Sequence, residues 1–326
     1  MVRVLSGIQP TGDMQLGNYL GAVRHWVADQ HRADSFFCVV DLHALTSGPD
    51  PAELARGTLR KATELLACGL DPDVCTLFVQ SQVAAHAQLA WLMECTASFG
   101  ELRRMTQFKD KSDGQEGVRV GVFTYPCLMA ADILLYDTDR VPVGDDQRQH
   151  LELARDLAVR WNSRYGDTFT VPEPSIPTVG ARVMDLQDPT SKMSKSRGTP
   201  QGRVDVFEDP AAIRRKITRA VTDTATEVRY DPADKPGVSN LLELLAATAG
   251  GTPAGLAARY EQYGPLKRDT AEAVIEFLRP LQDRFRALEA DPGYVRTCLA
   301  DGAAKAAAVA DPVLERAERA IGLLQR

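Results

Sequence analysis

The sequence predicts an α/β protein in which a doubly wound, mostly parallel (Rossmann-like) sheet is followed by an all-helical domain. Up to residue 190, segments with strand character alternate with segments of helical periodicity, which is typical of a parallel sheet covered by helices on both faces. After Gly198 the strand signals almost vanish. The length of 326 residues exceeds the usual size of a single core, so two domains are expected.

The first domain, residues 1–190, begins with a short strand over 2–8 and a helix in which Leu16, Leu20 and Val23 recur at helical spacing. Residues 35–41 are apolar without alternation and rich in β-branched and aromatic side chains, as in a buried strand. Further helices are expected over 51–68, 84–97, 123–136 and from Asp145 or Asp146 to about Tyr165. Further strands are expected over 74–80, 139–144 and 182–186.

The second domain, residues 191–326, reads as helices over 210–219, 239–249, 253–263, 266–289 and 303–324. Pro280 should kink or shorten the fourth of these, because proline removes a helix hydrogen bond. The boundary is expected within 187–202, and the last helices could pack back on the first domain.

Composition describes an ordinary soluble globular protein, with 44% hydrophobic and 25% charged residues. The N-terminus lacks the apolar stretch of a signal peptide, and no window approaches a membrane span. None of the six cysteines pairs at C-x-x-C spacing, which argues against a zinc or iron–sulfur site and favours reduced thiols in the cytoplasm. The net charge of −6 does not indicate a nucleic-acid partner, although local basic clusters leave one open.

Four segments carry candidate chemistry. In SGIQPTGDMQLGNYLG the chain leaves the first strand through Gly7 and enters a helix near Gly17 and Asn18. A helix start suits a phosphate, and Gly17 would allow a ligand close to the backbone. The alternative is a plain strand–turn–helix. In VPVGDDQ, Asp146 could accept hydrogen bonds from ribose hydroxyls and Gln147 could bind an α-amino or carboxylate group. The alternative is that the carboxylates are ordinary helix caps.

The third segment, FTYPCLMAADILLY, places Tyr125, Met129, Asp132 and Tyr136 on one helical stripe. Such a stripe is more often core than ligand pocket. An unpaired buried carboxylate costs several kcal/mol as a rough estimate, so Asp132 needs a donor from the protein or from a ligand.

The fourth segment, SKMSKS, holds Lys192 and Lys195 in a stretch with little to bury. A loop that closes only on a triphosphate would bring these cations to the leaving pyrophosphate late in the reaction. The alternative is a basic linker.

Taken together and in this order, these segments resemble the class I aminoacyl-tRNA synthetases, specifically the tryptophanyl-tRNA synthetases. The resemblance also includes VDLHALT, GELRRMTQFKDKS, AVTD and KPGVSNLLELLAA, and covers nearly the whole chain. SKMSKS is the signature loop of the family in full, and QLGN stands for its HIGH signature with Asn18 at the second histidine. Two positions depart from the family: Gln15, where threonine or histidine is more frequent, and Leu5, where some members carry phenylalanine.

The resemblance implies a role for each matching position. The residues implied to bind ATP are Gln9, Pro10, Thr11, Gly17, Asn18, Gly144, Asp145, Asp146, Val183, Lys192, Met193, Ser194, Lys195 and Ser196. Those with an implied catalytic role are Lys192, Lys195, Lys111, Gln9 and Asn18. Those implied to line the tryptophan pocket are Asp132, Tyr125, Met129, Gln147, His43, Gly7, Leu5, Val141 and Val143. Asp132 would accept the indole N–H, which would be its missing donor.

The function implied is that of a tryptophan–tRNA ligase. ATP activates L-tryptophan as the adenylate, with Mg²⁺ travelling on the phosphates and no structural metal expected; the tryptophanyl group then passes to tRNA(Trp). A homodimer in the cytoplasm without membrane contact is implied, as is an anticodon-binding role for the helical domain, with Arg214, Arg215, Lys216 and Arg219 as a guess. If Asp132 is otherwise unpaired, an analogue without the N–H should be rejected by about 10⁴ or more.

Three alternatives remain at this point. A tyrosyl enzyme has a similar fold, but the MAADILLY and GDDQ context argues against it. Another adenylyl transferase without tRNA would not need the long helical half. A tryptophan-adenylating paralogue with a regulatory, resistance or secondary-metabolic role is not excluded by any residue.

Overall fold

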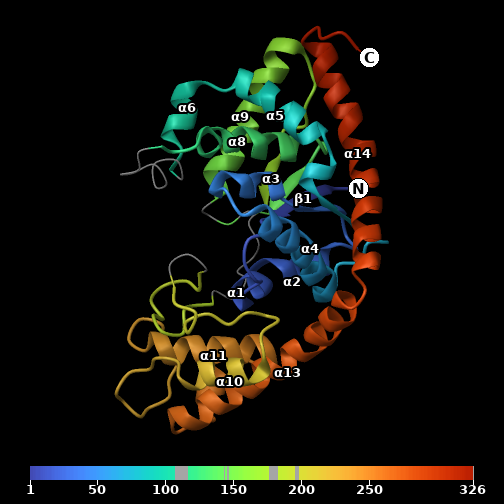
Figure 1. Ribbon diagram of the computed structural model, residues 1–326. Helices are drawn as coiled ribbons and strands as arrows, with labels where there is room; N and C mark the ends of the chain where they lie inside the picture. Colours follow the sequence, from blue (N-terminus) through green and yellow to red (C-terminus); the bar gives the residue numbers. More distant parts are fainter. Residues whose placement is uncertain (107–116, 143, 145–146, 176–182, 195–197, 326) are drawn as a thin grey trace.

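A computed structural model describes residues 1–106, 117–142, 144, 147–175, 183–194 and 198–325 (Figure 1). Its sheet has five strands in the order β3-β2-β1-β4-β5, and every pairing is parallel. The strands are β1 (Arg3–Ile8), β2 (Asp34–Val39), β3 (Thr76–Val79), β4 (Arg140–Pro142) and β5 (Glu173–Ser175). The doubly wound parallel sheet predicted from the alternating pattern is therefore confirmed.

Helices cover both faces of this sheet. They are α1 (Leu16–Asn18), α2 (Arg24–Asp29), α3 (Asp41–Ala44), α4 (Pro51–Cys68), α5 (Ala85–Thr96), α6 (Phe99–Arg104), α8 (Val120–Leu134) and α9 (Arg148–Tyr165). A π-helical turn over Tyr19–Val23 joins α1 to α2. Neighbouring side chains of β2 point to opposite faces, since Phe36 lies in the core with α5, α8 and α9, and Phe37 lies in the core with α4.

Helix α4 shows how closely local signals can fix an element. The side chain of Asp50 accepts hydrogen bonds from the amides of Ala52 and Glu53, and proline occupies the first helical position. Gly69 ends the helix with a left-handed φ of 109°. The observed bounds are those predicted from the sequence.

The observed strands differ from the expected ones in two places. The described part of residues 182–186 forms no strand of the sheet; it makes an isolated antiparallel bridge between Met184 and Lys192. The fifth strand is β5, which the sequence analysis missed. With three residues and a proline in the middle, β5 carries too little pattern to be recognised, and only its pairing with β4 defines it.

The second half of the chain is helical in its described residues, as predicted. It contains α10 (Pro210–Thr218), α11 (Pro236–Ala249), α12 (Pro253–Ala257), α13 (Tyr263–Glu289) and α14 (Pro292–Ala320). Helix α13 is not shortened at Pro280 but continues through it, because buried residues on both sides of the proline, among them Leu278 and Leu281, hold it in the core. Helix α14 begins well before residue 303, since the side chain of Asp291 caps it and Pro292 occupies its first position.

Helix α14 runs back along the side of the sheet domain (Figure 1). A Cβ added to Gly302 would lie 1.8 Å from the carbonyl oxygen of Leu77, so α14 approaches the β3 backbone as only glycine permits. Ala306 and Ala310 of the same helix are fully buried in the core with α5 and α8. Of the helices described, none is both long and apolar enough to cross a membrane.

Candidate active site

A cavity of about 350 Å³ opens at the carboxyl edge of the sheet. It lies where β1 has β2 on one side and β4 on the other, which is the switch point at which doubly wound sheets bind ligands. It is lined by Leu5, Ser6, Gly7, Gln9, Cys38, Val40, His43, Thr46, Tyr125, Met129, Asp132, Ile133, Val141, Pro142 and Gln147. Eight of the nine residues predicted for tryptophan are in this lining, and the ninth, Val143, lies outside the described residues.

The carboxylate of Asp132 is buried at the wall of this cavity and is held by three protein donors. Gln80 Nε2 donates to Oδ1 at 2.7 Å, and His86 Nδ1 reaches the same oxygen at 2.6 Å. His43 Nε2 reaches Oδ2 at 2.7 Å. Of the two sources of a donor left open by the sequence, the protein supplies three, and the estimate of 10⁴, which assumed an otherwise unpaired Asp132, loses its premise.

Hydrogen bonds further out fix the direction of two of these donors, Gln80 and His86. Gln80 Oε1 accepts the amide of Leu42 at 3.1 Å, which turns the NH₂ of Gln80 toward Asp132. His86 Nε2 lies 2.7 Å from the hydroxyl of Tyr136, so a neutral imidazole can donate to Asp132 through Nδ1 and accept from the tyrosine. Oδ1 thus has two donors and Oδ2 has one. Oδ2 keeps a lone pair for a further donor in the cavity.

The same contacts keep Asp132 ionised. Burial, the largest single effect, acts to raise the pKa of the carboxyl, but the hydrogen bonds and electrostatic attraction of His43 and His86 outweigh it and hold the pKa well below its ordinary value. Since the folded pKa lies below the unfolded one, the group stabilises the folded protein above its unfolded pKa of about 3.9. That contribution is lost as the pH falls below this value toward the folded pKa.

We expect His86→Phe to make tryptophan binding sensitive to acid. Phenylalanine keeps the ring packed against Phe78 but removes one donor, so the pKa of Asp132 rises. Calorimetric titration with tryptophan over a pH series should show that the affinity begins to fall at a higher pH in the variant than in the wild type. His31→Phe, at an exposed histidine, is the control. Parallel pH profiles for the two variants would contradict this role of His86.

Tyr125 lines the same cavity, two helical turns before Asp132 on α8. Its hydroxyl is 2.6 Å from Nε2 of His150, a buried residue of α9, and burial raises the pKa of the phenol well above its ordinary value. The hydroxyl therefore stays protonated at neutral pH and can act as a hydrogen-bond donor. Met129 lies one helical turn from both Tyr125 and Asp132 on α8 and adds an apolar, adaptable side chain to the same wall.

The two signature segments, far apart in sequence, lie against each other. A Cβ added to Gly17 would be 3.6 Å from Cβ of Val183 and 3.9 Å from Cβ of Met193. Met193 is buried and its amide donates to the carbonyl of Val183 at 3.1 Å, whereas Lys192 is exposed. Asn240 of α11 holds this hairpin, since its side-chain amide makes two 3.0 Å hydrogen bonds with the backbone of Met184.

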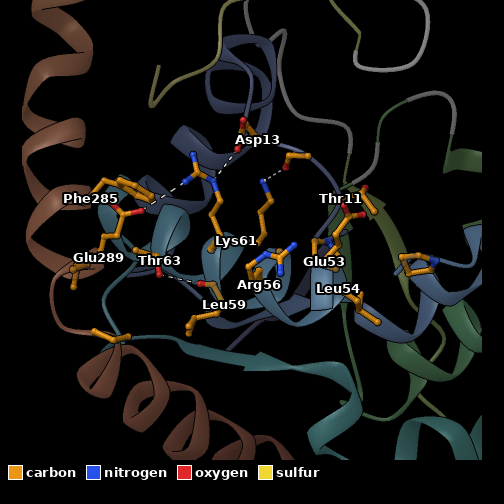
Figure 2. Close-up of a pocket in the computed structure, with 17 residues that line it drawn as sticks. Thr11, Asp13, Glu53, Leu54, Arg56, Leu59, Lys61, Thr63, Phe285 and Glu289 are labelled. Carbon is orange, nitrogen blue, oxygen red and sulfur yellow. Dashed lines mark hydrogen bonds and ion pairs between the residues drawn. The ribbon is translucent and has the colours of Figure 1, made fainter. Parts of the chain in front are cut away.

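Two other predicted ATP residues face a different cavity. Pro10 and Thr11 line a pocket of about 630 Å³ between the loop after β1, α4 and α13 (Figure 2). Gln9, predicted for ATP, lines the cavity of Asp132 instead. Lys111, Asp145, Asp146, Lys195 and Ser196 lie outside the described residues.

The guess that Lys216 reads the anticodon is not supported, because the lysine is buried and forms an ion pair with Glu208. Arg214 is exposed but paired with Glu272, Nε to Oε1 at 2.7 Å. Arg215 and Arg219 are exposed on the same short segment. Only part of this basic cluster is therefore open to a polyanion.

The sequence analysis missed Gln80 and His86. Both follow β3, and the carboxyl ends of parallel strands meet at one edge, so their position was a usable signal. This positional signal was weak, because a lone glutamine or histidine near a strand end more often forms a hydrogen bond within the core than takes part in a binding site.

Residues 1–279 match the sequence profile of the class I tRNA synthetases for tryptophan and tyrosine (W and Y), and the chain belongs to this family. The chain is 58% identical over 330 residues to tryptophan–tRNA ligase 1 of Streptomyces avermitilis, with 100% of both sequences covered.

Two solved structures agree in fold over the whole length. Tryptophanyl-tRNA synthetase from Mycoplasma pneumoniae superposes with a TM-score of 0.91 at 35% identity, covering 99% of this chain and 98% of that one. The enzyme from Campylobacter jejuni, complexed with ADP and tryptophan, gives 0.87 at 34% identity and covers 99% and 100%. Within the family, the chain therefore belongs with the tryptophan–tRNA ligases.

Proposed function

We propose that this chain is a tryptophan–tRNA ligase whose cavity at Asp132 binds L-tryptophan. The observation that carries the proposal is the ionised, buried carboxylate of Asp132, held by three donors with one lone pair left beside the cavity. An indole ring needs an apolar slot with one acceptor for its N–H. Tyrosine would bring a hydroxyl, which could also donate, so ring size and the Met129 wall must separate the two substrates.

The reaction needs positioning more than acid–base chemistry. A tryptophan carboxylate oxygen attacks the α-phosphorus of ATP, the new O–P bond forms, and the bond to pyrophosphate breaks. No general base is required, because the nucleophile is already an anion. Gln147 and Tyr125 lie where they could orient the amino acid, and Lys192 and Lys195 are proposed to stabilise charge on the pyrophosphate.

Pyrophosphate exchange tests this proposal. Wild-type protein with MgATP should incorporate labelled pyrophosphate into ATP with tryptophan, and at least about 10³-fold less efficiently with tyrosine. Charging of a tRNA(Trp) transcript should follow. Exchange with tryptophan but no charging would favour the adenylating paralogue. A preference for tyrosine would contradict the proposal.

Mg²⁺ is proposed to enter as part of the MgATP substrate. Among the described residues, no group of three or more His, Cys, Asp or Glu side chains could hold a metal ion. We also propose that the chain transfers tryptophan to tRNA and that it works in the cytoplasm. The boundary between the two domains is proposed to lie at residue 190.

A homodimer through the face of α5, α6 and α8 is also proposed. Three large apolar side chains are exposed there, Trp91 at 64%, Phe99 at 68% and Val120 at 75%. Leu45, exposed by 51%, adjoins Trp91 in a cavity between α5, α8 and the turn after α3. Exposed large apolar side chains on neighbouring helices are typical of a protein interface.

Trp91→Glu should therefore shift the protein toward the monomer. A charge at an interface centre is left without a partner, and the expected rise in the dimer dissociation constant is at least about 100-fold, as for a hot-spot residue. Sedimentation velocity over a concentration series measures it, with Val159→Glu as a control at another exposed apolar residue. A monomeric wild type, or an unchanged dimer in the variant, would contradict the proposal.

A further inference from the structure

One face of α4 carries a polar stripe directly beneath the loop that follows β1. The stripe has the spacing i, i+3, i+4 and i+7, so its members lie on one side of the helix. We call these four residues the α4 seat: Gly57, Arg60, Lys61 and Glu64.

The α4 seat contacts the loop at three points. A Cβ added to Gly57 would lie 2.6 Å from the carbonyl oxygen of Pro10, so the loop backbone uses the space that glycine leaves. Lys61 Nζ donates to the carbonyl of Gly12 at 3.0 Å, and Gly12 has a left-handed φ of 62°. Arg60 Nε donates to Oδ1 of Asp13 at 2.7 Å.

Stability alone does not explain the charges in this stripe. Lys61 is 1% exposed and Glu64 0%, and the two form an ion pair within the helix. Burial, the largest effect, raises the pKa of Glu64 despite the neighbouring Lys61 and Arg60 charges. Apolar side chains of similar size usually serve as well as or better than a buried ion pair for stability. What apolar side chains could not supply is the donor to Gly12.

The α4 seat also reaches the helical half of the chain. The guanidinium of Arg60 lies 5.0 Å from the ring centroid of Phe285, and its NH1 is 3.8 Å from Oε1 of Glu289, both on α13. Figure 2 shows Asp13, Lys61, Phe285 and Glu289 around the same cavity. Arg60 therefore lies between the loop and α13.

We propose that the α4 seat positions residues 10–18 for the ATP step, through a glycine contact with Pro10, a lysine donor to Gly12 and an arginine bridge from Asp13 to α13. The inference rests on the proposed function, since it takes ATP to be bound by this segment. Lys61 and Arg60 are positioning residues: they act through the backbone of Gly12 and the side chain of Asp13, and need not touch a substrate. Tryptophan is proposed to bind in the cavity of Asp132, which the α4 seat does not line, so the affinity for tryptophan should change little.

Two variants test this from opposite directions. Lys61→Met with Glu64→Leu removes the donor and both buried charges together, so no unpaired charge remains. Gly57→Ala improves the helix propensity of α4 but pushes a methyl group against Pro10. The controls are Lys305→Met, which removes a lysine bond to the carbonyl of Pro72, and Gly264→Ala, where a Cβ meets nothing closer than 3.7 Å. Melting temperature, kcat, KM for ATP and the dissociation constant for tryptophan are measured on the full chain.

Both test variants should melt close to the wild type. In both, kcat/KM for ATP should fall about tenfold to a hundredfold, with tryptophan affinity changed less than about twofold. Unchanged ATP kinetics in a folded variant would overturn the proposal, and so would equal losses for ATP and tryptophan together with lower stability. If the double variant does not fold, the ATP kinetics of Gly57→Ala test the proposal by themselves. A wild type without tryptophan-dependent exchange would instead defeat the proposed function itself.

Discussion

Asp132→Asn lowers kcat/KM for tryptophan by about 5-fold to 150-fold in pyrophosphate exchange, because a buried group left facing another donor costs about 1–3 kcal/mol. Asparagine has one acceptor oxygen where aspartate has two. Its NH₂ must face either His43 or the pair formed by Gln80 and His86, so donors meet donors. The effect should fall on tryptophan, with KM for ATP little changed.

Asp34→Asn is the matched control for this variant. Asp34 is the first residue of β2, so it lies at the amino ends of the strands, away from the cavity. Its carboxylate pairs with Arg3 at 2.8 Å. It should change tryptophan kinetics less than about twofold, since exposed ion pairs contribute little. Wild-type kinetics in the Asp132 variant would show that this carboxylate does not recognise the substrate.

Lys195→Ala lowers kcat for exchange by about 10²–10³-fold, which is typical when one stabilising group at a transition state is removed. The dissociation constant for tryptophan should change less than about twofold, because the lysine is expected to act only when pyrophosphate departs. Rapid-quench measurement of adenylate formation separates this step from binding. Lys305→Ala, on α14, controls for the loss of a surface lysine. Equal losses of rate and tryptophan affinity would contradict a late action of the loop.

Much of the fold could be predicted because its signals are local. Helix α4 has a cap, a proline at its start and a glycine after its end, and each acts within one turn of the chain. Strand β2 is apolar over consecutive residues, as a strand buried on both faces must be. Strand β5 had no such signal: its place is fixed by β4, and the proline within it hid it.

The site divides in the same way. Tyr125, Met129 and Asp132 share a stripe of one helix, so periodicity alone placed them together. The donors to Asp132 come from three other elements, and no spacing along the chain relates His43, Gln80 and His86. Their convergence depends on the order of the parallel strands. For this reason the sequence could show that Asp132 needs donors but could not show that the protein supplies three of them.

The most direct test of this account replaces the indole N–H by sulfur in the benzothiophene analogue of tryptophan. With three protein donors on the carboxylate, losing the fourth should cost about 1.5–3 kcal/mol, or about 10-fold to 150-fold in kcat/KM for exchange. Equal efficiency for the two substrates would mean that Asp132 does not accept the indole hydrogen. A loss above about 10⁴-fold would mean that the carboxylate is left unpaired, as in sites that lack other donors.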